Sequence, residues 1–187
     1  MRTNLTQLPT DLPVPEDDGS ADHLLGTILP DISLPTTSGG TLDLGNLGGR
    51  NVLYIYPMTG RPDVSLPDGW DETPGARGCT PQSCSFRDHF EELAMLRTGV
   101  IGLSVQTTDY QREARERLHL PFDLVSDSNL ALKTTLRLPT FEVAGMELYK
   151  RLTMIVQDRT IVRVFYPVFP PDRNADDVLD WLRNSGA

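Results

Sequence analysis

Hydrophobic and polar residues follow two different periods along this chain. Short runs rich in β-branched and aromatic residues, bounded by turn residues, are typical of strands in a buried sheet. The predicted strands are residues 51–56, 100–105, 122–125, 152–156 and 160–166. The last two are separated only by the turn 157–159, so we expect them to form an antiparallel hairpin at a sheet edge.

Apolar positions at steps of three and four predict helices between these strands. The predicted helices run from Thr80 to Gly99, from Thr108 to Leu118, from Asn129 to Leu136 and from Asn174 to Arg183. Thr80 and Thr108 have the residue type that caps helix starts, and Pro81 is favoured as a first helical residue. The order βαβα followed by ββα predicts an α/β fold, with a central mixed sheet flanked by helices on both faces.

Two segments lack any such period. Residues 1–25 carry prolines and acidic residues but little that could form a core, so we expect a partly disordered N-terminal extension before one domain at 26–187. Residues 57–78 contain four prolines and four glycines and predict a long loop. Loops longer than about 12–15 residues in a compact domain are usually functional or disordered. Because this loop leads directly to Cys79, we expect it to be functional.

Composition narrows the classes of function. With 17 basic and 26 acidic residues the net charge is −9, which argues against a nucleic-acid partner. No stretch approaches the roughly 20 apolar residues of a membrane span, and the first residues lack the apolar core of a secretory signal. We therefore expect a cytoplasmic protein with no membrane partner. Two cysteines are too few for a disulfide framework.

The two cysteines, Cys79 and Cys84, lie together at the start of a predicted helix. Backbone N–H groups and the positive end of the helix dipole gather there and favour the thiolate of Cys79, and Arg77 adds positive charge nearby. In an intact helix, residues five apart have Cα atoms about 8–9 Å apart. A disulfide needs about 4.4–6.8 Å. A Cys79–Cys84 bond therefore requires the first helical turn to unwind.

The cysteine pair belongs to a specific pattern, Gly-Cys-Thr-x-x-x-Cys followed by Phe-Arg-Asp. It occurs in order with four other segments, so that the set is Leu29–Pro35, Tyr54–Pro57, Gly78–Asp88, Leu120–Asp127 and Arg151–Val156. With these segments the chain resembles a peroxiredoxin of the Q type, the bacterioferritin-comigratory-protein branch, over about residues 26–184. The resemblance implies a thioredoxin-like fold and an antioxidant, thioredoxin-dependent peroxidase of the atypical two-cysteine kind, monomeric and without a cofactor.

The resemblance also implies a role for each site residue. Cys79 would attack hydrogen peroxide or an organic hydroperoxide and become a sulfenic acid. Cys84 would condense with it to an intramolecular disulfide, which a thioredoxin-like donor reduces. Arg151 would favour the thiolate and stabilise charge on the departing oxygen. Pro57 would shield the thiolate from bulk water.

The chain departs from the family in one place. The usual pattern is Pro-x-x-x-Thr-x-x-Cys, but a much longer segment separates Pro57 from Cys79, and Ala76 stands where the threonine is expected. Thr73 precedes Pro74-Gly75, which resembles the usual Thr-Pro-Gly-Cys. Either Thr73 reaches the site through a bulged loop, or the hydroxyl role is lost or moved.

Other interpretations remain open. The cysteines are also consistent with two inert buried thiols, and Arg151 with a surface ion pair. A metal site is disfavoured, because Cys79, Cys84 and His89 do not share a helical face. The aromatic and proline run 165–171 is expected to pack over the sheet edge rather than to form a site wall. A redox sensor without turnover, or a disulfide reductase for protein partners, are the alternative functions.

Overall fold

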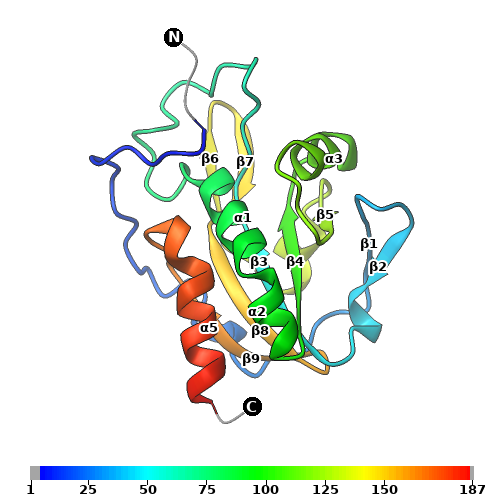
Figure 1. Ribbon diagram of the computed structural model, residues 1–187. Coiled ribbons are helices and arrows are strands. Elements are labelled where there is room, and N and C mark those ends of the chain that lie inside the picture. Colours follow the sequence, from blue (N-terminus) through cyan, green and yellow to red (C-terminus); the bar gives the residue numbers. More distant parts are fainter. Residues whose placement is uncertain (1–4, 186–187) are drawn as a thin grey trace.

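A five-stranded mixed sheet forms the centre of the computed structural model, which describes residues 5–185 (Figure 1). Its order is β5-β4-β3-β8-β9. The strands are β3 (Arg50–Ile55), β4 (Thr98–Ser104), β5 (Leu124–Ser126), β8 (Leu152–Gln157) and β9 (Thr160–Phe165). β4 runs parallel to both β3 and β5, whereas β8 is antiparallel to β3 and β9. The predicted mixed sheet and its edge hairpin are confirmed.

Side chains alternate along each strand and supply two apolar layers. Val52 and Tyr54 of β3 point into one layer, and Leu53 and Ile55 point into the other. The helices that pack on the first layer are α1 (Cys79–Asp88), α2 (Phe90–Met95), α3 (Thr108–Arg117) and α5 (Asn174–Asn184). Because strand side chains repeat with a period of two, Val52 and Tyr54 face the same helical layer that contains Cys79.

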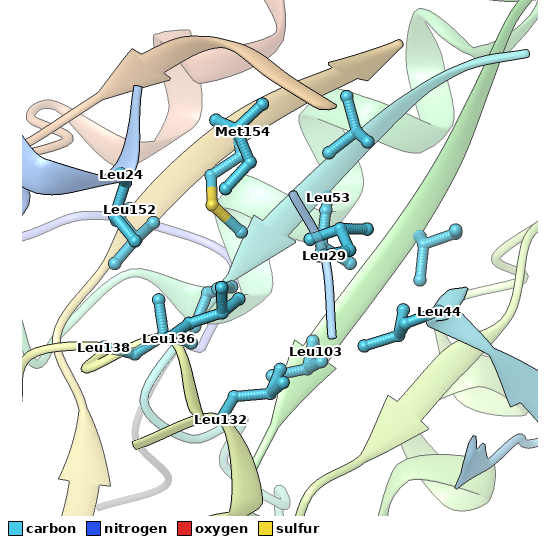
Figure 2. Packing of buried hydrophobic residues seen from close by; sticks show 14 of the residues in the cluster. Leu24, Leu29, Leu44, Leu53, Leu103, Leu132, Leu136, Leu138, Leu152 and Met154 are labelled. Carbon is cyan, nitrogen blue, oxygen red and sulfur yellow. The ribbon is translucent and has the colours of Figure 1, made fainter. Parts of the chain in front are cut away.

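The opposite face of the sheet is covered by shorter elements. These are the 3₁₀ turns η1 (Asp22–Leu24) and η2 (Leu44–Asn46), the hairpin β1 (Ser33–Pro35) and β2 (Thr41–Asp43), and α4 (Ala131–Thr135). Figure 2 shows how leucines from these elements meet Leu53, Leu103, Leu152 and Met154 of the sheet. All four of these sheet residues are fully buried. Helical elements thus lie on both faces, as predicted.

The predicted helix from Thr80 to Gly99 is wrong in its start and its continuity. It begins at Cys79, and its cap is Gly78, whose φ of 104° belongs to the left-handed region. A Cβ on Gly78 would lie 2.3 Å from Cγ of Pro171, so only glycine fits. The helix stops at Asp88, and α2 starts after His89, whose ring contacts Glu92 and Asp176 of α5.

One further prediction needs correction, and one element was not predicted. The cap of α3 is Thr107, not Thr108, because the Thr107 side chain accepts the hydrogen bond from the Tyr110 N–H. The hairpin of β6 (Thr140–Val143) and β7 (Met146–Tyr149) was not predicted from the sequence. This hairpin supplies an apolar surface on which the long loop 57–78 packs, through Trp70 and other apolar side chains. The loop is therefore packed against the domain over part of its length.

Residues ahead of the predicted domain boundary also pack against the sheet. Ala21 and Leu24 are buried in the core, and Asp18 forms an ion pair with Lys150. The first four residues of the predicted extension lie outside the described residues. Among residues 5–185, no helix combines the length and the apolar character that crossing a bilayer requires.

Gly102 provides a test of the packing beneath the site. It pairs with Tyr54 across β3 and β4, and a Cβ there would lie 2.5 Å from Leu124 and 2.6 Å from the Tyr54 ring. We expect Gly102→Val to lower the free energy of unfolding by about 1–3 kcal/mol, because it overpacks the core. Urea denaturation measures the change. Gly48→Val is the control, since a Cβ on Gly48 would have no neighbour within 4 Å; equal losses in both variants would contradict the prediction.

Candidate active site

Cys79 is the first residue of α1, beyond the end of β3, and only 3% of its surface is exposed. Its sulfur lies 3.2 Å from Nη2 of Arg151 and 3.4 Å from the backbone nitrogen of Met58, both of which donate to it. The thiol also donates to the carbonyl oxygen of Ala76 at 3.6 Å, and the same oxygen accepts from Nη2 of Arg151 at 3.1 Å. The sulfur therefore has two donors that favour its thiolate form.

Arg151 lies just before β8, and its guanidinium is as buried as the thiol. The same Nη2 donates to the carbonyl oxygens of Gly75, Ala76 and Arg77 at 3.0–3.1 Å. Two hydrogens on this nitrogen thus face four acceptors, the three carbonyls and the sulfur of Cys79. Charge-assisted hydrogen bonds are about twice as strong as neutral ones. The thiolate of Cys79 therefore competes with the three carbonyls for these hydrogens better than the neutral thiol does.

No carboxylate pairs with Arg151 among residues 5–185, so its charge is not neutralised by an acidic side chain. Its Nη1 instead donates to Oε1 of Gln82, a neutral and fully buried acceptor on α1. Gln82 in turn donates to Asn174 of α5 at 2.9 Å, and Thr153 of β8 donates to the same oxygen at 2.7 Å. This buried chain fixes the guanidinium in place and leaves Cys79 as the acidic group closest to it.

Met58 presents its N–H to the sulfur from a turn that a second glutamine holds. The Gln106 side chain, just after β4, accepts hydrogen bonds from the nitrogen and hydroxyl of Thr59 at 3.0 Å and donates to the Thr59 carbonyl at 3.1 Å. Pro57 is buried and directly precedes Met58. The predicted site residue Pro57 therefore belongs to the turn that approaches Cys79.

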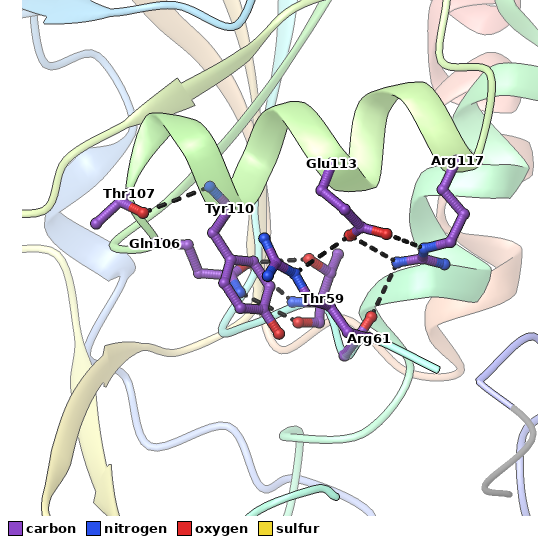
Figure 3. Close-up of polar contacts among 8 residues, drawn as sticks. Thr59, Arg61, Gln106, Thr107, Tyr110, Glu113 and Arg117 are labelled. Carbon is purple, nitrogen blue, oxygen red and sulfur yellow. Dashed lines mark hydrogen bonds and ion pairs between the residues drawn. The ribbon is translucent and has the colours of Figure 1, made fainter. Parts of the chain in front are cut away.

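The next residues of this turn are attached to α3 (Figure 3). Arg117 donates to the carbonyl oxygen of Gly60 at 2.9 Å and pairs with Glu113 at 2.6 Å. Arg61 lies over the Tyr110 ring, 4.0 Å from its centre, and 3.6 Å from Glu113. The pairing of Glu113 with Arg117 agrees with their i,i+4 spacing. These contacts keep the start of the long loop in a fixed position beside the sulfur.

Cys84 lies about one and a half turns along the same helix and is half-buried. Burial raises the pKa of its thiol, although the nearby Arg87 acts in the opposite direction. Both cysteines are free thiols on an intact helix, whose geometry keeps their Cα atoms about 8–9 Å apart. Tyr54 holds this segment to the sheet, because it donates to Ser83 at 3.1 Å and stacks on Phe86 with ring centres 4.6 Å apart.

The Thr73 hydroxyl does not hydrogen-bond to the Cys79 sulfur. Its hydroxyl donates to the carbonyl oxygen of Gly69 at 2.7 Å, and its side chain lines a cavity beside Arg151. At the position where the family threonine is expected, the carbonyl of Ala76 contacts Cys79 instead. Arg77, named from the sequence as a nearby charge, is buried and pairs with Asp71 at 3.3 Å.

Hollows of very different size lie near the site. A space of about 10 Å³ opens at Cys79 itself, and its walls include Leu5, Met58, Leu66 and Trp70. A larger cavity of about 430 Å³ lies beyond Arg151, and Cys79 does not line it. In the part of the chain that is described, no cluster of three or more His, Cys, Asp or Glu side chains is arranged to hold a metal ion.

Sequence reasoning missed the residues that orient the donors: Gln82, Asn174 and Gln106. Gln82 had a usable signal, since it lies three residues after Cys79 on the same helix and so close to the same helical face. Gln106 and Asn174 had none, because only the sheet topology and the return of α5 bring them to this place.

Comparison with known proteins gives concordant results. A family model described as Redoxin matches residues 24–179. The chain is 29% identical over 161 residues to the chloroplastic peroxiredoxin Q of Populus jackii, covering 85% of this chain and 68% of the relative. It is 28% identical to that of Suaeda salsa, covering 85% and 67%.

Solved structures with the same fold include peroxidoxin BcpB from Mycobacterium tuberculosis. That crystal structure is 27% identical, has a TM-score of 0.67, and covers 85% of this chain and 96% of its own. A mutant of Xylella fastidiosa PrxQ, at 19% identity and a TM-score of 0.68, covers 87% of this chain and 97% of its own, and supports the fold alone.

The contact between Arg151 and Cys79 predicts how fast the thiol is alkylated. We expect Arg151→Met to slow the reaction of Cys79 with iodoacetamide at pH 7 by about tenfold, because one charge-assisted hydrogen bond to the thiolate is lost. Peptide mass spectrometry of timed samples gives the rate. Arg163→Met removes an exposed arginine of β9 and is the control. An unchanged rate in the Arg151 variant would show that the guanidinium does not act on the sulfur.

The raised pKa of Cys84 predicts a pH dependence of labelling. A thiol whose pKa lies above the ordinary value of 9.0 is almost entirely protonated at pH 7. In the folded protein we therefore expect iodoacetamide to modify Cys79 before Cys84, and the labelling of Cys84 to increase as the pH rises. In urea at pH 8 both cysteines should react. Equal labelling of the two cysteines in the folded protein at pH 7 would contradict this assignment.

Proposed function

Because the chain belongs to the Redoxin family and is a Q-type peroxiredoxin, a thiol peroxidase with a thioredoxin-like fold, we propose that Cys79 is the cysteine that attacks peroxide. The observation that carries this assignment is the 3.2 Å contact between its sulfur and a buried guanidinium without a carboxylate partner among residues 5–185. For Cys84, burial disfavours the thiolate. The two cysteines therefore have different roles in the proposal.

The first step oxidises Cys79. Its thiolate attacks the terminal oxygen of the hydroperoxide, the O–O bond breaks, and the leaving oxygen takes up a proton and departs as water or alcohol. The sulfur is oxidised by two electrons to a sulfenic acid, and the peroxide is reduced. Arg151 and the Met58 N–H donate hydrogen bonds to the sulfur, and the same donors lie close to where charge develops on the peroxide oxygens.

The second step joins the two cysteines. The Cys84 sulfur attacks the sulfenic sulfur, water leaves, and an intramolecular disulfide forms. Because an intact helix keeps the two Cα atoms too far apart, α1 must unwind over residues 79–84. Unwinding separates Tyr54 from Ser83, so the hydrogen bond that ties this turn to the sheet is lost at this stage.

A dithiol of the thioredoxin type then returns the protein to its reduced form by thiol exchange. Peroxide as substrate and a thioredoxin-type reductant follow from the class of enzyme; the identity of the donor, a monomeric state and a cytoplasmic location are parts of the proposal. Pro57 and Thr73 are proposed to act as walls of the site, Pro57 through the turn beside Met58 and Thr73 beside Arg151.

Substitution of each cysteine tests the proposal. We expect Cys79→Ser to abolish peroxide consumption, and Cys84→Ser to retain one reduction per chain, to accumulate a sulfenic acid and to lose turnover with thioredoxin. Stopped-flow peroxide consumption and dimedone labelling with mass spectrometry measure these outcomes. Peroxide reactivity that survives in the Cys79 variant would reverse the two roles. Oxidation of the wild type without turnover by any dithiol donor would favour the redox sensor.

A further inference from the structure

The N-terminal segment 5–18 runs across the mouth of the thiol site. Leu5 lines the small hollow at Cys79, together with Leu66 and Trp70 of the long loop. A Cβ on Gly60 would lie 2.9 Å from Cδ2 of Leu5, so the two segments are in close contact. Leu5 is partly buried although it lies ahead of the region matched by the family model.

The segment continues along the same face of the molecule. Cδ2 of Leu8 lies 2.9 Å from the ideal Cβ position of Gly78, the cap of α1, and Pro15 lies 3.6 Å from that of Gly75. Between these points Leu12 and Pro13 line a hollow that Arg151 also lines. Apolar side chains thus face the site at intervals along the whole path.

A polar anchor ends this path. Asp18 pairs with Lys150, the residue before Arg151, at 2.5 Å, and accepts a hydrogen bond from the Tyr166 hydroxyl at 2.7 Å. Residues 5–18, which we call the strap, are therefore held at one end by charge and at the other by apolar contacts around Cys79. The strap lies ahead of the region that the family model matches, and it meets the long loop 57–78, where the chain departs from the family pattern.

We propose that the strap and the long loop form a size filter, which admits hydrogen peroxide and small hydroperoxides to Cys79 and excludes bulky ones. The free space at the sulfur is about 10 Å³, close to the least that holds one water molecule. Hydrogen peroxide is little larger than water, whereas an aromatic or long-chain hydroperoxide needs the space that Leu5, Leu66 and Trp70 occupy. The inference rests on the proposed function of Cys79 and adds the class of substrate.

Leu5 is the side chain whose removal widens the filter with least disturbance of the fold. Leu5 and Leu8 are each partly exposed, and both lie outside the apolar core clusters of the domain. The double variant Leu5→Ala/Leu8→Ala should therefore unfold at the same temperature as the wild type. Leu25→Ala, which shortens a leucine that is 63% exposed, is the matched control.

The first measurement compares two peroxides with dithiothreitol as reductant. We expect the double variant to react with cumene hydroperoxide about tenfold faster than the wild type, with the rate for hydrogen peroxide changed less than about twofold. The Leu25 control should match the wild type for both. An unchanged ratio of the two rates, whether both stay the same or both rise equally, would overturn the size filter.

A second measurement does not depend on peroxide chemistry. In a Cys84→Ser background, Cys79 is labelled with iodoacetamide, which is small, and with fluorescein maleimide, which is bulky. We expect the double variant to speed the bulky reagent by about tenfold and iodoacetamide by much less. If neither peroxide reacts with the wild type, the proposed function fails while this labelling ratio still decides the filter; an unchanged labelling ratio rejects the filter even where peroxide turnover is normal.

Discussion

A buried guanidinium without an acidic partner in the described part of the chain is the constraint on which this site depends. Arg151 is surrounded by carbonyl oxygens, an amide oxygen and one thiol. A cation removed from water is costly unless its hydrogen bonds are satisfied, and even satisfied it gains further from a nearby anion. Within residues 5–185, the acidic group at hydrogen-bonding distance from it is the Cys79 thiol, so the fold itself gains when that sulfur carries a negative charge.

The other residues of the site hold Arg151 and Cys79 in position relative to each other. One glutamine holds the guanidinium from α1, and the other holds the turn that presents the Met58 N–H. Both are neutral and buried, so they orient the donors without competing for charge. An acid in place of Gln82 would neutralise the arginine, and the electrostatic advantage of the thiolate would diminish.

Much of the fold was predictable because it rests on local patterns. Strand periods, the apolar faces of α1 and α5 and the hairpin at the sheet edge follow from side chains near in sequence, and Val178, Leu179 and Leu182 are buried as their spacing indicates. The hairpin β6–β7 escaped because its strands are four residues long and contain charged residues, and its burial comes from the distant loop 57–78. The helix start escaped because the need for glycine at Gly78 comes from Pro171, which is remote in the sequence.

The site was predictable to a similar extent. Chemistry carried by a residue type at a given spacing, as for Cys79 and Cys84, is visible in the sequence. The partners that tune it are set by topology: Arg151 reaches the sulfur because β8 lies beside β3 in the sheet. The roles of Cys79, Cys84, Arg151, Pro57 and Thr73 in the reaction stay predictions. The strap was not foreseen, since residues 1–25 were expected to be partly disordered.

The break between α1 and α2 at His89 limits how far unfolding of α1 would spread along the helical layer during the proposed redox cycle. Its ring bridges Glu92 and Asp176, so the junction of α1 and α2 is tied to α5 by groups that lie apart from both cysteines. In a continuous helix, melting at one end weakens the neighbouring turns in sequence, because each turn supports the next. In the proposed cycle the break at His89 limits this cooperativity, so we expect α2, with its buried Leu93, to remain docked while the cysteine segment opens. Oxidation would then unfold the short α1 segment rather than the whole helical layer, and on reduction α1 would refold against elements that have stayed in place.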